Sequence, residues 1–429
     1  MRVLVVGSGG REHAISWGLA RSPRVDHLVV APGNAGIADV ARTVPEVGAD
    51  DLDAVVALAS TERADLVVVG PEAPLVAGLA DGCREQGIAV FGPAAAAAML
   101  EGSKSFAKEL MASGGIPTAR SRSFTQVDPA IGYVGTLGGR AVVKADGLAA
   151  GKGVTVAHDR DAAVSAVREC LDDGAFGAAG ARVVIEEVLE GPEVSAFALV
   201  DAHTVAPLGL SQDFKRVGDG GSGPNTGGMG AYSPLPWVDD DTERAIWSIV
   251  DSTVDEMRRR HLDYRGLLYT GLMLTDDGPK VLEYNCRFGD PETEVVIPRL
   301  ASDLADLLET TALDRLADVK VALRDDAAVT VVLASGGYPG PYEIGVTIDG
   351  LADAAATPGA TVFHAGTARR GDTVVTAGGR VLAVTGTGAT IGQARDVAYR
   401  AAGHITFEGM TYRRDIAAEA AELAGEERR

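Results

Sequence analysis

Cysteine, positive charge and long apolar segments are scarce in this sequence, and each shortage excludes a class of protein. The three cysteines, Cys83, Cys170 and Cys286, are scattered over 429 residues and form no C-x-x-C pair. No disulfide framework is expected, and the pattern fits the reducing cytoplasm. The apolar run Val3–Val6 is too short for a signal sequence, and no run reaches the roughly 18 apolar residues that a membrane span needs. We therefore expect a cytoplasmic protein without a membrane partner.

Basic residues are outnumbered by acidic ones. The chain has 39 Lys and Arg against 60 Asp and Glu, which gives a formal net charge of −21. A field of this sign repels polyanions, so no nucleic-acid partner is expected, although a local basic pocket for a small phosphate is compatible with it. Hydrophobic residues make up 46% and charged residues 23%, as in globular rather than disordered proteins.

Familiar catalytic signatures are missing as well. The sequence contains no H-E-x-x-H, no G-x-S-x-G and no clustered set of Cys and His ligands. Their absence disfavours a covalent hydrolase and a structural zinc protein.

The first third of the chain alternates apolar runs with helical stretches. Runs at 2–6, 27–31 and 66–70 are typical of buried parallel strands, and helical stretches at 12–21 and 52–60 lie between them. At about 150 residues per domain, the length predicts two to four domains. We expect the first, over residues 1–102, to be an open doubly wound α/β domain.

The pattern changes after residue 102, and a second domain is predicted over 103–325. Four β-rich runs between 140 and 200, with one helix among them, predict a small α+β subdomain. Residues 211–236 lack apolar periodicity and are rich in glycine, which predicts a long functional or mobile loop. A helix at 241–260 and a β-hairpin at 268–285 follow.

The last block, residues 326–429, is predicted to be a third domain of the α+β type. Strand-like runs lie near 329–334 and 380–385, and a helical stretch lies near 391–403.

A glycine-rich turn, Gly7-Ser8-Gly9-Gly10-Arg11-Glu12, follows the first predicted strand. It departs from the dinucleotide-binding pattern G-x-G-x-x-G because Glu12 takes the last glycine's place, and no acidic residue ends the second strand. NAD binding is therefore disfavoured. A generic anion site at a helix N-terminus beside Arg11 and a tight turn without a ligand both stay open.

A second glycine-rich segment, Gly147–Gly153, lies between two predicted strands. It is not a Walker A loop, because only three residues separate Gly147 from Gly151-Lys152 and because Gly153 replaces the Ser or Thr that would bind magnesium. Two interpretations stay open: a flexible hairpin that covers a triphosphate, and an ordinary glycine hairpin. Lys144, which ends the preceding apolar strand, is equally ambiguous by itself.

The strand Val281–Arg287 is more informative. Its period of two places Glu283, Asn285 and Arg287 on one face, so that two oxygen donors lie next to a guanidinium. Magnesium takes few protein oxygens and completes its shell with phosphate and water, and arginine can bind the same phosphate. The pattern predicts a metal and phosphate site, with a solvated strand face as the alternative.

Five features occur in order along the chain: Lys104, Lys144, the glycine hairpin, a strand that ends in Glu186-Glu187, and the Glu-x-Asn-x-Arg hairpin. Together they resemble the ATP-grasp superfamily. Longer strings over the whole chain resemble its glycinamide ribonucleotide synthetase family. The most specific are Ala-Pro-Gly-Asn-Ala-Gly (31–36), Lys-Ala-Asp-Gly-Leu-Ala-Ala-Gly-Lys-Gly-Val (144–154), Gly-Pro-Asn-Thr-Gly-Gly-Met-Gly-Ala-Tyr-Ser-Pro (223–234) and Asn-Cys-Arg-Phe-Gly-Asp-Pro-Glu-Thr (285–293).

This resemblance implies an ATP-grasp fold for 103–325 with a β-rich lid at about 120–192. It also implies a purine-biosynthesis ligase that joins glycine to 5-phosphoribosylamine through glycyl phosphate and converts ATP to ADP and phosphate. We expect it to act as a monomer on these small molecules.

The resemblance further assigns residues to four roles. Those implied for ATP are Lys104, Lys144, Gly151, Lys152, Gly153, Glu186, Glu187, Val188 and Glu193. Those implied to ligate Mg²⁺ or Mn²⁺ are Glu283 and Asn285. Those implied for substrate binding are Gly9, Gly10, Arg11, Asn34, Pro71, Glu72, Asn225, Thr226 and Gly227. Those implied for catalysis are Asp213, Lys215, Arg287 and Asp290.

Two alternative functions are considered. Another ATP-grasp ligase, acting on aminoimidazole ribotide or on a carboxylation substrate, would share the lid and the metal strand but not Gly-Pro-Asn-Thr-Gly-Gly-Met-Gly. A non-catalytic ATP sensor could keep the lysines, but the intact Glu283, Asn285 and Arg287 argue against it.

Overall fold

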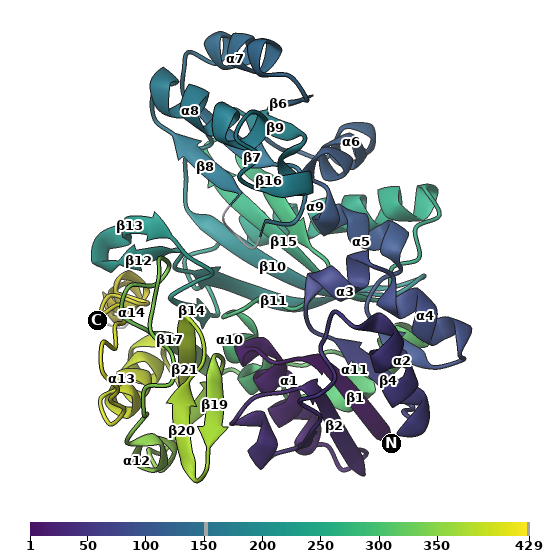
Figure 1. Cartoon of the computed structure of the whole chain (residues 1–429), viewed down its shortest axis with the longest axis vertical. Helices are drawn as coiled ribbons and strands as arrows, with labels where there is room; N and C mark the ends of the chain where they lie inside the picture. Colours follow the sequence, from purple (N-terminus) through teal and green to yellow (C-terminus); the bar gives the residue numbers. More distant parts are fainter. Residues whose placement is uncertain (150–152, 427–429) are drawn as a thin grey trace.

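The computed structural model describes residues 1–149 and 153–426, and places a first domain, a lid and a third domain around a central sheet (Figure 1). Gly151 and Lys152, expected to contact ATP, lie outside the described residues. Within the described ranges, no helix is long and apolar enough to cross a membrane.

The first domain is the doubly wound α/β unit that the sequence predicts. Its five-stranded sheet has the order β3-β2-β1-β4-β5, and every neighbouring pair is parallel. Its strands are β1 (Arg2–Gly7), β2 (His27–Pro32), β3 (Arg42–Thr43), β4 (Leu66–Val69) and β5 (Ala89–Phe91). Its helices are α1 (Gly10–Ala20), α2 (Leu52–Thr61), α3 (Glu72–Val76) and α4 (Leu79–Glu85), followed by α5 (Ala95–Gly102).

The lid is a separate small layer at the top of Figure 1. Its antiparallel sheet has the order β6-β9-β7-β8, and two helices pack on it around a small apolar core. The elements are β6 (Ser121–Phe124), α7 (Val127–Thr136), β7 (Ala141–Ala145), β8 (Val154–Ala157), α8 (Arg160–Leu171) and β9 (Val183–Glu186). Helix α7 was not predicted. The last of the four β-rich runs predicted between 140 and 200 is β10 (Glu193–Val200), which belongs to the central sheet instead because it pairs with β11 and β15.

The central sheet has eight strands in the order β16-β15-β10-β11-β14-β17-β21-β18 and continues into the third domain. Strands β11 (Val205–Asp213), β14 (Gly230–Ser233), β15 (Gly266–Thr275) and β16 (Gly278–Asn285) belong to the central domain. Helices α6 (Lys104–Gly114), α9 (Asp240–Arg259), α10 (Thr293–Val296) and α11 (Leu304–Ala312) complete it.

The expectation of a long loop at 211–236 was wrong. This segment contains the end of β11, a small ribbon of β12 (Arg216–Gly218) and β13 (Ser222–Asn225), and the sheet strand β14. Strand β14 bridges β11 and β17 and has no apolar periodicity because both of its faces are buried.

The third domain is mixed α+β, as expected. Its strands are β17 (Ala327–Ala334), β18 (Ala360–His364), β19 (Thr367–Arg370), β20 (Thr373–Thr376) and β21 (Arg380–Gly388), and its helices are α12 (Leu351–Ala355), α13 (Ile391–Ala402) and α14 (Ala418–Glu426). Since β14 pairs with β17, backbone hydrogen bonds join the central and third domains. The multidomain fold class is confirmed, and the limits 1–102, 103–325 and 326–429 stay a prediction.

Candidate active site

A pocket of about 410 Å³ lies where the first domain, the lid, the central sheet and the third domain meet. Its wall combines basic and acidic side chains from all four parts. The charged residues that line it are Arg11, Glu72, Glu101, Lys104, Lys108, Lys144, Glu186, Asp213, Lys215, Glu283, Arg287, Asp290, Glu292 and Arg380.

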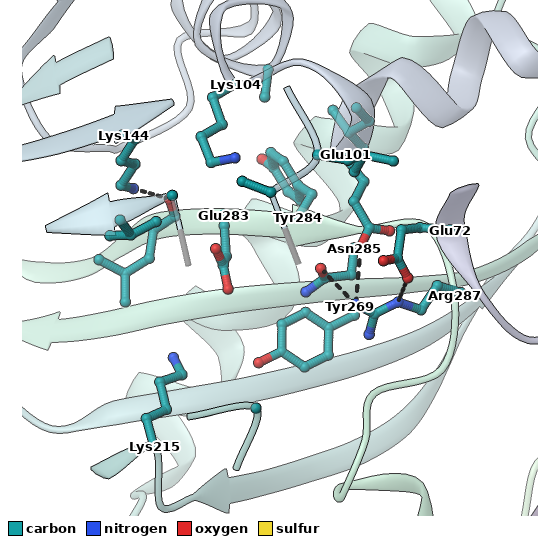
Figure 2. Close-up of a pocket in the computed structure, with 18 of the residues that line it drawn as sticks. Glu72, Glu101, Lys104, Lys144, Lys215, Tyr269, Glu283, Tyr284, Asn285 and Arg287 are labelled. Atoms are coloured by element: carbon teal, nitrogen blue, oxygen red, sulfur yellow. Dashed lines mark hydrogen bonds and ion pairs between the residues drawn. The ribbon is translucent and has the colours of Figure 1, made fainter. Parts of the chain in front are cut away.

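Strand β16 and the residues directly after it form one wall of this pocket. Glu283, Asn285 and Arg287 line it, as the sequence pattern predicts, and Leu282 and Tyr284 line it as well. Figure 2 shows Glu283 and Asn285 pointing into the same space. Between them, the Tyr284 hydroxyl turns toward α9 and lies 2.8 Å from the Thr253 hydroxyl. The alternative of a solvated strand face does not fit, because this face is turned into the pocket.

Glu283 lies in a ring of cations. Lys104 and Lys144 lie on one side of it and Lys215 on the other (Figure 2). Burial alone would raise the pKa of the Glu283 carboxyl, but the surrounding positive charges, Lys215 foremost, outweigh burial and lower it. The group is therefore an ionised oxygen donor at neutral pH.

Arg287 is held by two carboxylates from other elements. Its Nε lies 3.2 Å from Glu72 Oε2 on α3, and its Nη2 lies 3.0 Å from Glu101 Oε1 on α5. Glu101 Oε2 also accepts a hydrogen bond of 2.7 Å from the Cys286 amide. Burial would lower the pKa of Arg287, but Glu101 and Glu72 reverse that effect and raise it. The guanidinium is therefore a fixed positive charge beside Asn285, whose Oδ1 accepts from Nη2 at 3.3 Å.

The lid contributes a buried ionic cluster. Glu186, at the end of β9, lies between Lys144 and Lys108, with N–O distances of 3.0 and 3.1 Å. Lys144 Nζ also donates to the Leu282 carbonyl at 3.0 Å, which ties the lid to β16. Burial lowers the pKa of Lys108 to about 8, although Glu186 counteracts it. The cluster places two ammonium groups beside one carboxylate at the lid side of the pocket.

Acidic groups dominate the opposite wall. Lys215 pairs with Glu193 and lies 4.0 Å from Asp213, and these carboxylates raise its pKa well above the ordinary value despite the opposing effect of burial. Burial raises the pKa of the Asp213 carboxyl. Burial also raises the pKa of Glu292, and the negative charge of Asp213 adds to this effect, so that the pKa of Glu292 is about 7. This wall suits a ligand that carries an ammonium group.

The glycine turn before α1 is occupied by carboxylates of the protein itself. Glu12 accepts a hydrogen bond of 2.5 Å from the Gly9 amide, and Asp290 Oδ2 accepts one of 3.3 Å from the Arg11 amide. Arg11 in turn donates from Nη1 to the Phe288 carbonyl at 3.2 Å. The turn therefore joins the first domain to the segment that follows β16.

Several predicted residues lie away from the pocket lining. Asn34 is engaged with backbone: its Nδ2 donates to the Ser8 and His364 carbonyls, and its Oδ1 accepts from Gly36 and Ile37. Glu187 pairs with Arg120 at 2.7 Å. The other predicted residues that do not line the pocket are Gly9, Gly10, Pro71, Val188, Glu193 and Asn225. Gly153, Thr226 and Gly227 do line it.

Sequence reasoning missed Lys108, Glu101 and Arg380. Lys108 could have been found, since it follows Lys104 by one helical turn and so shares its face of α6. Glu101 and Arg380 carry no local signal, because only the packing of α5 and β21 brings them to the pocket.

A divalent cation fits the donors present. Glu283 offers a carboxylate and Asn285 an amide oxygen, and two protein oxygens suffice for magnesium when phosphate and water complete the shell. Across residues 1–149 and 153–426, no group of three His, Cys, Asp or Glu side chains gathers as a metal cluster.

Comparison with known proteins agrees with this geometry. Three protein-family models, one for each domain of phosphoribosylglycinamide synthetase, match successive parts of the chain. The N-domain model matches residues 1–101, the ATP-grasp model 102–293 and the C-domain model 328–419. The chain belongs to this family.

Individual relatives are similar over nearly their full length. Phosphoribosylamine–glycine ligase of Rhizobium meliloti is 53% identical over 97% of this chain and 98% of its own, and that of Streptomyces coelicolor is 54% identical over 98% and 100%. The crystal structure of the Thermotoga maritima ligase superposes with a TM-score of 0.86 at 36% identity, over 97% of this chain and 100% of that one. The family resemblance inferred from the sequence is confirmed.

Proposed function

We propose that the pocket is the active site in which this chain joins glycine to 5-phosphoribosylamine and converts ATP to ADP and phosphate. The observation that carries the assignment is Glu283 and Asn285 on one strand face, inside a ring of lysines that includes Lys104 and Lys144. Such a ring suits a triphosphate with a divalent cation.

The first step requires positioning rather than a nucleophilic side chain. A carboxylate is a poor electrophile, so glycine is activated by transfer of the γ-phosphoryl group to its carboxylate oxygen. Lys104, Lys144 and Arg287 neutralise the phosphate charge and hold the reacting groups in line. Mg²⁺ or Mn²⁺ at Glu283 and Asn285 would supply further charge neutralisation of the phosphates.

In the second step the amine of phosphoribosylamine attacks glycyl phosphate and phosphate leaves. Fixed N–H donors and cations near the tetrahedral oxyanion stabilise this step by up to several kcal/mol. Water must be excluded because it would hydrolyse the acyl phosphate. We propose that the lid closes the site while the turn before α1 and Glu72 face the phosphoribosylamine, and that Asp213, Lys215, Thr226 and Asp290 surround glycine.

The family resemblance implies further assignments for the nucleotide. We propose that Glu186, Glu187, Val188 and Glu193 hold the nucleoside and that residues 151–153 cover the triphosphate. We also propose that the enzyme is a cytoplasmic monomer without nucleic-acid or membrane partners. The net charge of −21 and three buried, unpaired cysteines support this proposal.

The test is an assay of ADP release with purified protein, Mg²⁺ and ATP, and with glycine, phosphoribosylamine, both or neither. We expect turnover to be strongest with both substrates and to vanish when EDTA removes the metal. Full turnover with another carboxylic acid and none with glycine would contradict the function, and ATP binding without any turnover would favour the sensor.

A further inference from the structure

The turn formed by Thr226, Gly227 and Gly228, here called the 226–228 turn, borders the pocket and is held from outside the central domain. Arg380, the first residue of β21 in the third domain, donates from Nη1 to the Gly227 carbonyl. From the same domain, the Tyr338 hydroxyl accepts a hydrogen bond of 3.0 Å from the Gly227 amide. The third domain therefore holds both the backbone amide and the backbone carbonyl of Gly227.

The same Arg380 nitrogen also binds Asp290. Nη1 donates to the Asp290 carbonyl at 2.8 Å and lies 3.2 Å from its Oδ1. The other carboxylate oxygen of Asp290 accepts from the Arg11 amide at the first turn of α1. Asp290 is therefore oriented from two sides, by the third domain and by the first.

The 226–228 turn and Asp290 are also packed directly together. Gly228 has a φ of +110°, and a Cβ at this position would lie 2.4 Å from Pro291 Cδ. Only glycine satisfies both the backbone conformation and the contact. A change in the position of Arg380 would therefore move both the 226–228 turn and Asp290.

The groups that Arg380 fixes are acceptors. A carbonyl oxygen has two lone pairs, and a carboxylate accepts several hydrogen bonds, so Gly227 and Asp290 retain capacity after binding Arg380. Both line the pocket, on the acidic side that also contains Asp213 and Glu292. Fixed carboxylates and carbonyls together are the surroundings that an ammonium group requires.

We propose that Arg380 is a positioning residue of the amino-acid subsite, which acts by holding Asp290 and the Gly227 carbonyl in the arrangement that receives the ammonium group of glycine. The inference rests on the proposed function. It makes the third domain part of the active site, although that domain has no predicted site residue.

The test compares steady-state kinetics of R380A and R380K with wild type. In R380A the KM for glycine should rise about 10- to 100-fold, while the KM for ATP should change less than about twofold. R380K keeps the charge but cannot reach all the acceptors, so it should restore part of the loss. Arg400 is an exposed arginine on α13 of the same domain, so R400Q should match wild type.

A double-mutant cycle tests whether Arg380 acts through Asp290. If it does, R380A should raise the glycine KM less in D290N than in wild type, because the Asp290 carboxylate is already gone and only the Gly227 carbonyl remains for Arg380 to position. Y338F, which removes only the hydroxyl that accepts from Gly227, should raise the glycine KM by a smaller factor and carries the test if R380A does not fold.

Three outcomes would overturn the proposal: an unchanged glycine KM in both R380A and Y338F, equal increases in the KM values for glycine and ATP, or full additivity of R380A with D290N. Wild-type protein without glycine-dependent ADP release would instead refute the proposed function. The two failures are therefore distinguishable.

Discussion

At the scale of single residues, the charged side chains of the pocket support one another, so a substitution acts beyond its own contact. Glu283 is ionised because cations surround it, and Arg287 is fixed because Glu72 and Glu101 hold it. Removing a partner leaves a buried charge uncompensated, which costs more than the lost contact alone.

Glu283→Ala and Asn285→Ala should each lower turnover at least 100-fold and leave the fold intact, because both remove an oxygen donor that faces the pocket. Turnover is measured by ADP release and the fold by circular dichroism. D277N, in the exposed turn of the same hairpin, is the control and should retain wild-type activity. Near-normal turnover in both alanine variants would place the metal elsewhere.

Lys108→Met should destabilise the protein by about 1–3 kcal/mol, because Glu186 keeps only Lys144 as a partner in a buried site. We also expect a higher KM for ATP, since the cluster lies at the lid side of the pocket. Urea unfolding and steady-state kinetics measure the two effects. K320M, at the surface, should change neither stability nor the KM for ATP. A K108M variant with wild-type values in both assays would refute this role.

At the scale of elements, α1 and β18 form a contact between the first and third domains that depends on neutral histidines. His13 Nδ1 accepts a hydrogen bond of 2.7 Å from the His364 amide, and the His13 ring lies edge-on to Phe363. Burial, with a smaller effect from His364, lowers the pKa of His13 to about 3, and burial lowers that of His364 to about 4.

Acid should therefore weaken this contact. Between pH 6.5 and the lower pKa values of the folded state, the two histidines bind more protons in the unfolded chain than in the folded one. The stability that the neutral histidines contribute is therefore fully present well above pH 6.5 and is lost as the pH falls. At pH 5 the expected loss is about 2 kcal/mol for each histidine. Asn at position 13 keeps an acceptor and cannot titrate, so H13N should show a smaller difference in urea stability between pH 7 and pH 5 than wild type.

The pH dependence of stability must be compared between wild type and H13N, because buried carboxyls make the folded state more stable as the pH falls, whereas the histidines make it less stable. The pKa of Glu292 is raised to about 7, so its protonation favours the folded state as the pH falls. H158Q, at an exposed histidine, is the matched control. Equal pH dependence in wild type and H13N would refute the role of His13.

At the scale of the whole molecule, the lid is the part with its own apolar core. Its buried residues, from Ala130 to Ile185, form a cluster separate from the two larger ones, which extend through the other domains. Its connections to the remainder include Lys144 to Leu282 and Lys108 to Glu186. A small apolar core of its own is expected to open before the larger cores of the main sheet.

Amide hydrogen exchange should therefore be faster in β7 and β9 than in the central strands β10 and β15, and saturating MgATP should slow exchange in the lid strands selectively. Exchange followed by mass spectrometry resolves these peptides. If lid and central strands exchange at the same rate without nucleotide, the lid does not open independently.

The sequence by itself determined the parts that depend on local spacing. Apolar runs ending in glycine predicted the strands of the first domain, and the period of two in Val281–Arg287 predicted which side chains share a face. Family-specific strings then identified the chemistry. Such signals are local because neighbouring residues alone decide how a strand alternates or where a helix stops.

The tertiary structure decided how distant segments meet. It moved β10 from the lid to the central sheet, turned the expected loop at 211–236 into strands, and brought Glu101 and Arg380 to the pocket. It also showed Asn34 bound to backbone rather than lining the pocket. Sheet order and domain contacts depend on pairings between residues far apart in the chain, and no local pattern encodes which partner a strand edge or a buried charge will find.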